Sequence, residues 1–411
     1  MHKRFLLVVL AAVVFMASGC AVPFHKKLDT HIAAAEYAEA ESLIEKEKKA
    51  GSMGVYGPKN ELLYLFDRGA VLQMEGNYGK SVTYFNTAEE LIDKLYTKSV
   101  LNEAGSFLSN DLALNYDGED FEHVMVHVLK ALNFMYEGNF RGAGVEARKV
   151  NHKINVIADT MGKNAVYTDD PLARYISALA YEALGENESA RIDYKKSAEA
   201  YEKHASVYKL DTPLRVKEDA LRLAAAVGHT GDVLMMRKKW GEINPEPHRN
   251  IAQSGEVILV VYDGLPAYKK DERKWPKFVK RGVVVQSAHL SDDTGKSAAS
   301  FVAHDISALA VKNLEAKNAQ IMMKKIGSTI VKQMAKNVPG LNLFVGEDKA
   351  DTRSWRTLPA RFHIARLAAA PGKRVITAEI KNTRTGAVDK YEFEVSLKRG
   401  EKKVIPVFKM M

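Results

Sequence analysis

Helical segments that recur around a short glycine turn constrain the fold of this 411-residue chain more than any other feature. Between residues 28 and 241, apolar residues recur at spacings of three and four, which is the period of an amphipathic helix. In residues 69–92 and again in 131–150, a turn glycine (Gly76, Gly138) is followed two positions later by an aromatic residue. Each such unit predicts two antiparallel helices, and several units predict a stacked helical array.

The small residues within these units resemble those of the tetratricopeptide repeat. Gly69 and Ser81 take positions where two helices cross, and Phe85 faces the partner helix. Residues 178–201 make a third unit, and residues 35–46 resemble the second helix of a further one. The turn aromatics lie farther apart than the ~34 residues of the repeat, so extra segments separate the units. The resemblance implies a helical array with a concave binding face.

A wider resemblance rests on three segments: "YDGEDFEHVMVHVLKALNFMYEGNFRGAGVEARKVN", "DDPLARYISALAYEALGENESARIDYKKSAEAY" and "DTRSWRTLP". Together they look like a poorly characterised family of bacterial envelope lipoproteins with tetratricopeptide-like repeats. The resemblance implies an envelope lipoprotein with a repeat domain and a β-rich end. It supplies no catalytic residues.

The amino-terminal segment has the pattern of a secretory signal. Two basic residues precede an apolar run over residues 5–16, and small residues then lead to Cys20, the single cysteine of the chain. The run is shorter than the roughly 20 residues that span a bilayer. The small residues before Cys20 resemble a bacterial lipobox, although Ala17 stands where leucine is usual. The alternatives are an ordinary cleaved signal with a chance cysteine, or a chain that is not secreted.

Lipidation of Cys20 would anchor the mature chain, because each buried CH₂ of an acyl chain such as palmitate contributes roughly 0.8 kcal/mol. We therefore predict a signal peptide at residues 1–19 and a lipidated tether at 20–27. Residue 21 is alanine rather than the aspartate that retains enteric-type lipoproteins at the inner membrane. This favours a periplasm-facing position on the outer membrane.

The overall charge argues against nucleic acid as a partner. The net charge is +9, with 27% charged residues, and no basic stripe interleaved with aromatic residues is visible. The modest basic excess fits an ordinary solvated surface or attraction to anionic envelope surfaces.

Charged and amide residues among the alanine-rich helices are the candidate site. They either pair with one another between helices or contact a bound peptide or glycan. A tryptophan in "DTRSWRTLP" is a candidate anchor in a core or an interface. The partner-binding candidates are Glu119, Glu122, Glu146, Arg148, Asn151 and Trp355.

Two other patterns suggest chemistry only weakly. His123 and His127 lie four apart on one helix face, but zinc needs three or four ligands and Val124 stands where the zincin pattern has glutamate. "GKS" at 295–297 imitates the end of a phosphate-binding loop, but Leu290 occupies the place of its first glycine. We read this segment as a strand-to-helix turn. The sequence thus predicts no metal, no cofactor and no catalytic residues.

The carboxyl-terminal third changes character after two prolines in residues 242–255, which we predict as a linker. Residues 256–411 predict a mixed α/β domain with short strands, including a half-buried alternating strand at "KYEFEVSL" and a set of antiparallel strands at the end. Residues 301–336 predict one long helix that packs on its own domain or lies on an anionic membrane.

These observations predict an α+β protein: a tetratricopeptide-like helical-repeat domain at 28–241 and a smaller mixed or β-rich domain. The predicted function is a non-enzymatic, lipid-anchored envelope scaffold that binds a protein partner through a groove in cell-wall or outer-membrane assembly. A peptidoglycan- or glycan-binding lipoprotein is the alternative. A hydrolase whose residues converge only in three dimensions is the third.

Overall fold

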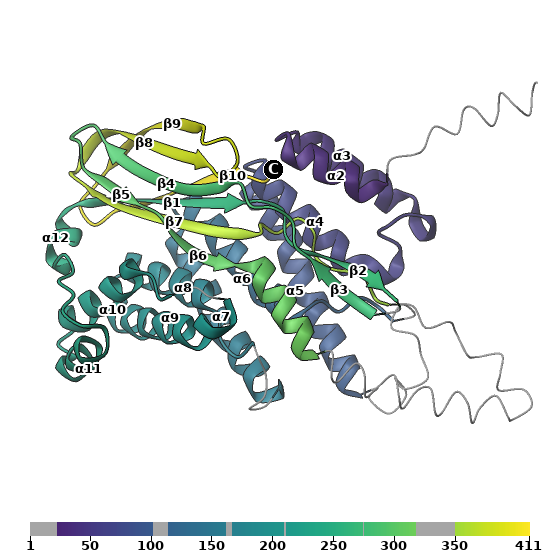
Figure 1. The fold of residues 1–411 in the computed structure, drawn as a ribbon, viewed down its shortest axis with the longest axis horizontal. Coiled ribbons are helices and arrows are strands. Elements are labelled where there is room, and N and C mark those ends of the chain that lie inside the picture. The colour runs from purple at the N-terminus through teal and green to yellow at the C-terminus, as the bar shows by residue number, and fades with distance from the viewer. Residues whose placement is uncertain (1–22, 102–113, 162–166, 209–210, 274, 318–349) are drawn as a thin grey trace, which may run out of the picture.

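Helices make up the first part of the chain and strands the second (Figure 1). The computed structural model describes residues 23–101, 114–161, 167–208, 211–273, 275–317 and 350–411. The helices are α2 (Phe24–Ala33), α3 (Tyr37–Lys49), α4 (Glu61–Met74), α5 (Tyr78–Leu101), α6 (Asp120–Tyr136), α7 (Phe140–Met161), α8 (Pro171–Ala183), α9 (Asn187–Tyr208), α10 (Leu214–Ala226), α11 (Thr230–Trp240) and α12 (His248–Gln253).

Helices α4 and α5, α6 and α7, α8 and α9, and α10 and α11 form antiparallel pairs, and a glycine lies in the turn inside each pair. Gly76, Gly138, Gly185 and Gly228 all have positive φ, between 73° and 85°, where a side chain would be strained. At the α6–α7 turn, the Gly138 N–H donates to Met135 O and the next N–H donates to Phe134 O, which satisfies carbonyls left free at the helix end. The paired helices confirm the predicted repeat-like architecture.

The strands form two four-stranded sheets and one hairpin. The first sheet has the order β10-β1-β7-β6, the second has the order β5-β4-β8-β9, and β2 pairs with β3. The strands are β1 (Gly255–Asp263), β2 (Tyr268–Glu272), β3 (Trp275–Val279), β4 (Val285–Asp292), β5 (Ser297–Ala299), β6 (Phe301–Asp305), β7 (Arg361–Ala369), β8 (Gly372–Asn382), β9 (Val388–Leu397) and β10 (Lys402–Lys409).

Strand β1 is buried along its whole length because the first sheet is covered on both faces. Ile258 and Val260 pack in the core shared with the helices. Val257 and Leu259, which point to the opposite face, pack in a second core with residues of β4 and β8. The molecule therefore has three layers: helices, first sheet and second sheet (Figure 1). Together with the helix pairs, this β-rich region confirms the predicted fold class.

The structure corrects several strand-level predictions. Strand β10 runs parallel to β1, so the final strands are not an all-antiparallel set. The apolar pattern of a strand sets which face is buried but not the direction of its neighbour. The predicted helix at 301–336 begins only at residue 306, because residues 301–305 pair with β7 as strand β6. Residues 318–336 of that prediction lie outside the described residues.

The local structure of two shorter segments also differs from what the sequence predicted. The "GKS" turn at Gly295 connects β4 to β5 and is therefore a strand-to-strand turn. Residues 242–255, read as a linker, contain the short helix α12. The alternating strand "KYEFEVSL" is confirmed in β9, where the side facing the second core is partly buried and the other side is exposed.

The predicted signal and Cys20 lie outside the described residues. Within the ranges that the structure describes, no helix is both long enough and apolar enough to cross a membrane.

Helices α4 and α5 cross so closely at Gly69 that a larger side chain there should destabilise the protein. A Cβ added at Gly69 would lie 2.5 Å from the buried ring of Phe85, which itself packs on Trp355. We expect Gly69→Ala to lower the free energy of unfolding by about 1–3 kcal/mol, as overpacked cores do. Chemical denaturation measures the difference.

Gly79→Ala is the matched control for this substitution, because the nearest atom to its added Cβ is 4.0 Å away in Glu137. This control should be neutral or slightly stabilising, since alanine is the better helix former. Equal effects of the two substitutions would contradict the close crossing.

Candidate functional site: the junction of helices and strands

One buried arginine connects the first sheet to the helices. Arg366 of β7 is fully buried, and its Nε and Nη2 donate to the two carboxylate oxygens of Glu256 in β1, both at 2.8 Å. Its Nη1 donates at 2.8 Å to Asp219 of α10 and to the hydroxyl of Tyr194 in α9. The planar guanidinium therefore fixes the sheet against two helices at once.

Further charges extend this cluster. Arg222 of α10 donates to Glu182 of α8 at 2.9 Å, and Lys402 of β10 lies 3.3 Å from the same carboxylate. Three buried carboxylates thus face three buried cations. Arg215, with 28% of its side chain exposed, lies at the edge of this group and forms ion pairs with Asp219 and Glu256. We call this set the junction cluster: Glu182, Asp219, Glu256, Arg215, Arg222, Arg366 and Lys402.

Opposite charges within the junction cluster offset the cost of burying Glu182 and Arg366. Burial alone would raise the pKa of Glu182, but Lys402 and the two buried arginines hold it well below its ordinary value. Burial likewise opposes ionisation of Arg366, but Asp219 and Glu256 raise its pKa. Because every buried charge has a partner, the cluster is a fixed ionic contact and not a poised acid or base.

An open pocket lies beside the junction cluster. Its volume is about 450 Å³, and it lies between α10, the segment before α12, and strands β5 and β7. Arg215, Arg222 and Arg366 are among the residues that line it, and Lys296 lines it from the turn before β5. This volume falls within the ~300–1,000 Å³ of ligand sites.

A second contact between helices and strands centres on Glu122. Its carboxylate accepts hydrogen bonds from the Tyr116 hydroxyl at 2.6 Å, the Glu119 backbone N–H at 2.9 Å and the Trp355 backbone N–H at 2.8 Å. Trp355 is 2% exposed and stacks on Phe66 of α4, with ring centroids 4.2 Å apart. Trp355 is therefore held inside the molecule.

The pKa values of the two acids at this contact, Glu119 and Glu122, are shifted in opposite directions. Burial, and next the charge of Glu119, raise the pKa of Glu122 to about 7. Burial would raise the pKa of Glu119 too, but Lys269 and Lys317 lower it to about 2. At neutral pH Glu119 is charged, while Glu122 is near its midpoint.

This separation predicts a pH dependence of stability. Between about pH 4.5 and 7, folded Glu122 keeps a proton that the unfolded chain loses, so its contribution to stability falls as pH rises. In Glu122→Gln that titration is absent. We expect the unfolding free energy of wild type minus that of Glu122→Gln to fall by about 3 kcal/mol from pH 4.5 to pH 8.

Urea denaturation across this pH range tests the Glu122 prediction. Glu90→Gln, at an exposed position of α5, controls for the loss of a carboxylate from the surface. Parallel stability profiles for wild type and Glu122→Gln would rule out a protonated Glu122.

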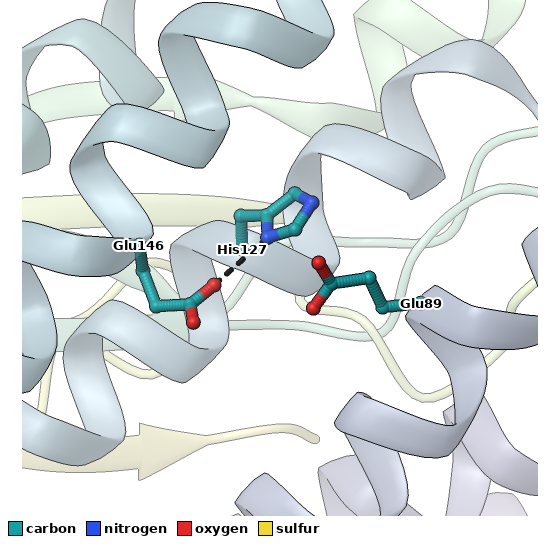
Figure 2. A group of neighbouring side chains, drawn as sticks. All are labelled: Glu89, His127 and Glu146. Carbon is teal, nitrogen blue, oxygen red and sulfur yellow. Dashed lines mark hydrogen bonds and ion pairs between the residues drawn. The ribbon is translucent and has the colours of Figure 1, made fainter. Parts of the chain in front are cut away.

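Three side chains in the helical array converge in the manner of metal ligands. Figure 2 shows Glu89 of α5, His127 of α6 and Glu146 of α7, with ligand atoms within 4.8 Å of one another. However, the buried Nζ of Lys130 lies 2.6 Å from Glu89 and 3.0 Å from Glu146. Lys149 Nζ also lies 2.8 Å from Glu89, so two ammonium groups already balance the two carboxylates and the group does not fit a divalent cation.

The other histidine of the predicted pair has a different partner. His123 Nε2 lies 2.6 Å from Asp117 O, whereas His127 Nδ1 lies 2.8 Å from Glu146. The two rings therefore do not share a ligand site.

The six candidate residues fall into separate places. Glu119, Glu122 and Trp355 meet at the second contact between helices and strands. Glu146 belongs to the lysine-paired group of Figure 2. Asn151 donates to Asp193 at 3.0 Å inside the array, while 56% of the Arg148 side chain is exposed on α7.

The second helices of three successive pairs expose apolar side chains at matching positions. Val145 of α7, Ile192 of α9 and Met235 of α11 each lie the same number of residues after their turn glycine. They are 45%, 42% and 48% exposed. Arg148 follows Val145 by three residues, so both lie on one face of α7. We call Val145, Arg148, Ile192 and Met235 the outer row.

Sequence reasoning missed the junction cluster, although a signal was present. Arg366 interrupts an apolar strand in "RFHIARLAA", and Glu256 opens the apolar strand "GEVILVV". Asp219 and Arg222 likewise interrupt the apolar helix "EDALRLAAA". Charged residues at positions that the period assigns to the core require buried partners.

Comparisons with known proteins give limited information. No family model and no curated protein matches the chain. Among solved structures it is similar to the "Podosopora anserina putative kinesin light chain nearly identical TPR-like repeats", at 12% identity and a TM-score of 0.34, covering 53% of this chain and 96% of that one. It is also similar to BtubC (BKLC) from P. vanneervenii, at 11% identity and a TM-score of 0.34, covering 54% and 81%. At these values the fold assignment rests on the helix pairs themselves.

Proposed function

We propose that this protein is a non-enzymatic, lipid-anchored scaffold of the bacterial outer membrane that faces the periplasm and binds a protein partner. The charged start, apolar run and small residues before Cys20 support the anchor. Paired helices of this kind build extended binding surfaces, which supports the scaffold. The likeness to envelope lipoproteins with tetratricopeptide-like repeats, noted in the sequence, adds to the proposal.

The chain's own first sheet occupies the inner face of the helical array, so we place the partner on the outer face. Helix α6 contacts β10 and helix α8 contacts β6, so the chain's own first sheet lies where the sequence reading placed a partner groove. The outer row lies on second helices and leaves apolar side chains exposed. This single observation carries the proposal that the partner contacts the outer row, with Arg148 as its charged member.

A capture experiment tests this surface. The soluble chain, residues 21–411, is used to recover proteins from detergent-solubilised envelope. We expect one envelope protein to be recovered reproducibly and to be reduced at least tenfold by the double variant Val145→Asp and Ile192→Asp, because charges replace exposed apolar contact area. Val375→Asp, at a 40% exposed position of β8, is the matched control and should leave recovery unchanged.

The same experiment separates the competing functions. Binding to isolated sacculi without any recovered protein would replace the scaffold by a peptidoglycan-binding lipoprotein. Recovery that survives both outer-row charges would place the partner surface elsewhere and refute this part of the proposal.

The lipid anchor has its own test. We expect Cys20→Ser to abolish incorporation of labelled palmitate, because the hydroxyl does not replace the thiol as lipid acceptor. Ala21→Asp should keep the label but shift the chain to the inner-membrane fraction of an enteric-type host. Labelling that persists in Cys20→Ser would show that Cys20 is not the acceptor.

A further inference from the structure

The β2–β3 hairpin is separate from both four-stranded sheets. Among the described strands, β2 and β3 pair only with each other. One face of the hairpin packs inward, because Pro276 and Phe278 are buried and Lys269 pairs with Glu119. Residues directly opposite each other in an antiparallel pair point to the same side, so the register shows which residues share the outer face.

The outer face places two lysines directly opposite each other. Lys270 of β2 and Lys277 of β3 are partners in the register, and both are exposed. Like charges in this position destabilise a pair of strands. Glu272 lies 2.9 Å from Lys277, but Lys270 makes no ion pair within the described ranges. An anion supplied from outside the chain would relieve the repulsion between the two lysines.

The positive charge of the hairpin stays in excess when its internal partners are counted. Residues 268–281 contain seven basic and two acidic side chains. Lys269 is neutralised by Glu119, and Arg281 is neutralised by Asp29 of α2. When these two pairs and the two acids of the hairpin are set aside, three positive charges remain. The described basic residues that are exposed are Lys270, Arg273, Lys277 and Lys280.

The hairpin lies beside the helix that follows the proposed lipid anchor. Asp29 of α2 lies 2.7 Å from Arg281, whose guanidinium lies over the ring of Tyr268 in β2. Figure 1 shows the start of α2 and the hairpin at the same end of the molecule. Pro23, the first described residue, follows Cys20 by three positions, a reach of at most about 11 Å. A chain anchored at Cys20 would therefore hold this end close to the bilayer.

An aromatic residue shares the outer face with the two lysines. Trp275 of β3 is half-buried, and it lies two residues before Lys277 and opposite Glu272. Tryptophan and lysine are typical of membrane–water interfaces, where the ring lies at the level of the headgroups and the ammonium reaches the phosphates. From this face, the excess of positive charge and the position beside α2, we infer that the β2–β3 hairpin binds the phosphate headgroups of an anionic phospholipid bilayer. This inference rests on the proposed lipid anchor, which would bring the hairpin to the membrane.

Flotation with phospholipid vesicles tests the hairpin. The mature chain, residues 21–411, carries no acyl group and is mixed with vesicles of phosphatidylcholine alone or of phosphatidylcholine with phosphatidylglycerol. We expect binding to the vesicles that contain phosphatidylglycerol to be at least about tenfold stronger, because basic residues are attracted to anionic headgroups. The preference should shrink as salt is raised, since these charges are exposed.

Paired substitutions locate the binding. The double variant Lys270→Gln and Lys277→Gln should weaken binding to the anionic vesicles about tenfold or more, since each basic residue at such a surface contributes roughly fivefold. Glu272→Gln should strengthen it about two- to fivefold, because it removes a like charge from the outer face. The double variant Arg237→Gln and Lys238→Gln is the matched control: it removes the same charge from exposed positions of α11, at the opposite end of the molecule (Figure 1), and should leave binding unchanged.

Several results would contradict the inference. Equal flotation with the two kinds of vesicle, or equal losses in the two double variants, would overturn it. Release from the vesicles by inorganic phosphate at constant ionic strength would show a site for small anions instead of a membrane surface. Urea midpoints at or above that of wild type show that the lysine variant stays folded, as expected when opposed like charges are removed. The chain used here lacks Cys20, so a failure of flotation is distinguishable from a failure of palmitate labelling.

Discussion

The guanidinium of Arg366 is the contact on which the arrangement of the layers depends. It holds Glu256 of the neighbouring strand with two parallel hydrogen bonds and reaches Asp219 of α10 with the third nitrogen. Apolar packing alone allows a sheet to slide over helices, whereas a planar fork with five donors accepts few positions. A buried ion cluster adds little net stability, but a buried charge that loses its partner is strongly destabilising. Any other position of the sheet on the helices would separate these charges and is therefore higher in free energy.

Docking of the first sheet changes what the helical array can do. An isolated array of helix pairs presents its inner face to other proteins. Here the strands of the same chain cover α6 and α8, and Trp355 packs on Phe66. The array therefore supports the chain's own β-rich region, while the side chains of the outer row stay exposed on its second helices.

Sequence alone predicted what depends on local periodicity. The helix pairs followed from the spacing of three and four and from glycines such as Gly76 and Gly138, because those glycines need positive φ. The face of β9 followed from strict alternation. The direction of β10 and the strand at residues 301–305 did not follow, because pairing with β1 and β7 decides them. The candidate residues Glu122 and Trp355 were found as isolated polar and aromatic signals, but their contact joins segments far apart in sequence.

The parallel pairing of β10 with β1 sets an order of events for the growing chain. Residues 402–409 complete the sheet that residues 255–263 begin, so one hydrogen-bonding edge of β1 stays open until residues 402–409 have been made. Helices α2 to α11 have mostly local contacts and can form first, whereas the sheet waits for its most distant strand. Until then, the apolar inner surface of the helices and a bare strand edge are exposed together, which is the stage at which this polypeptide most needs protection from aggregation.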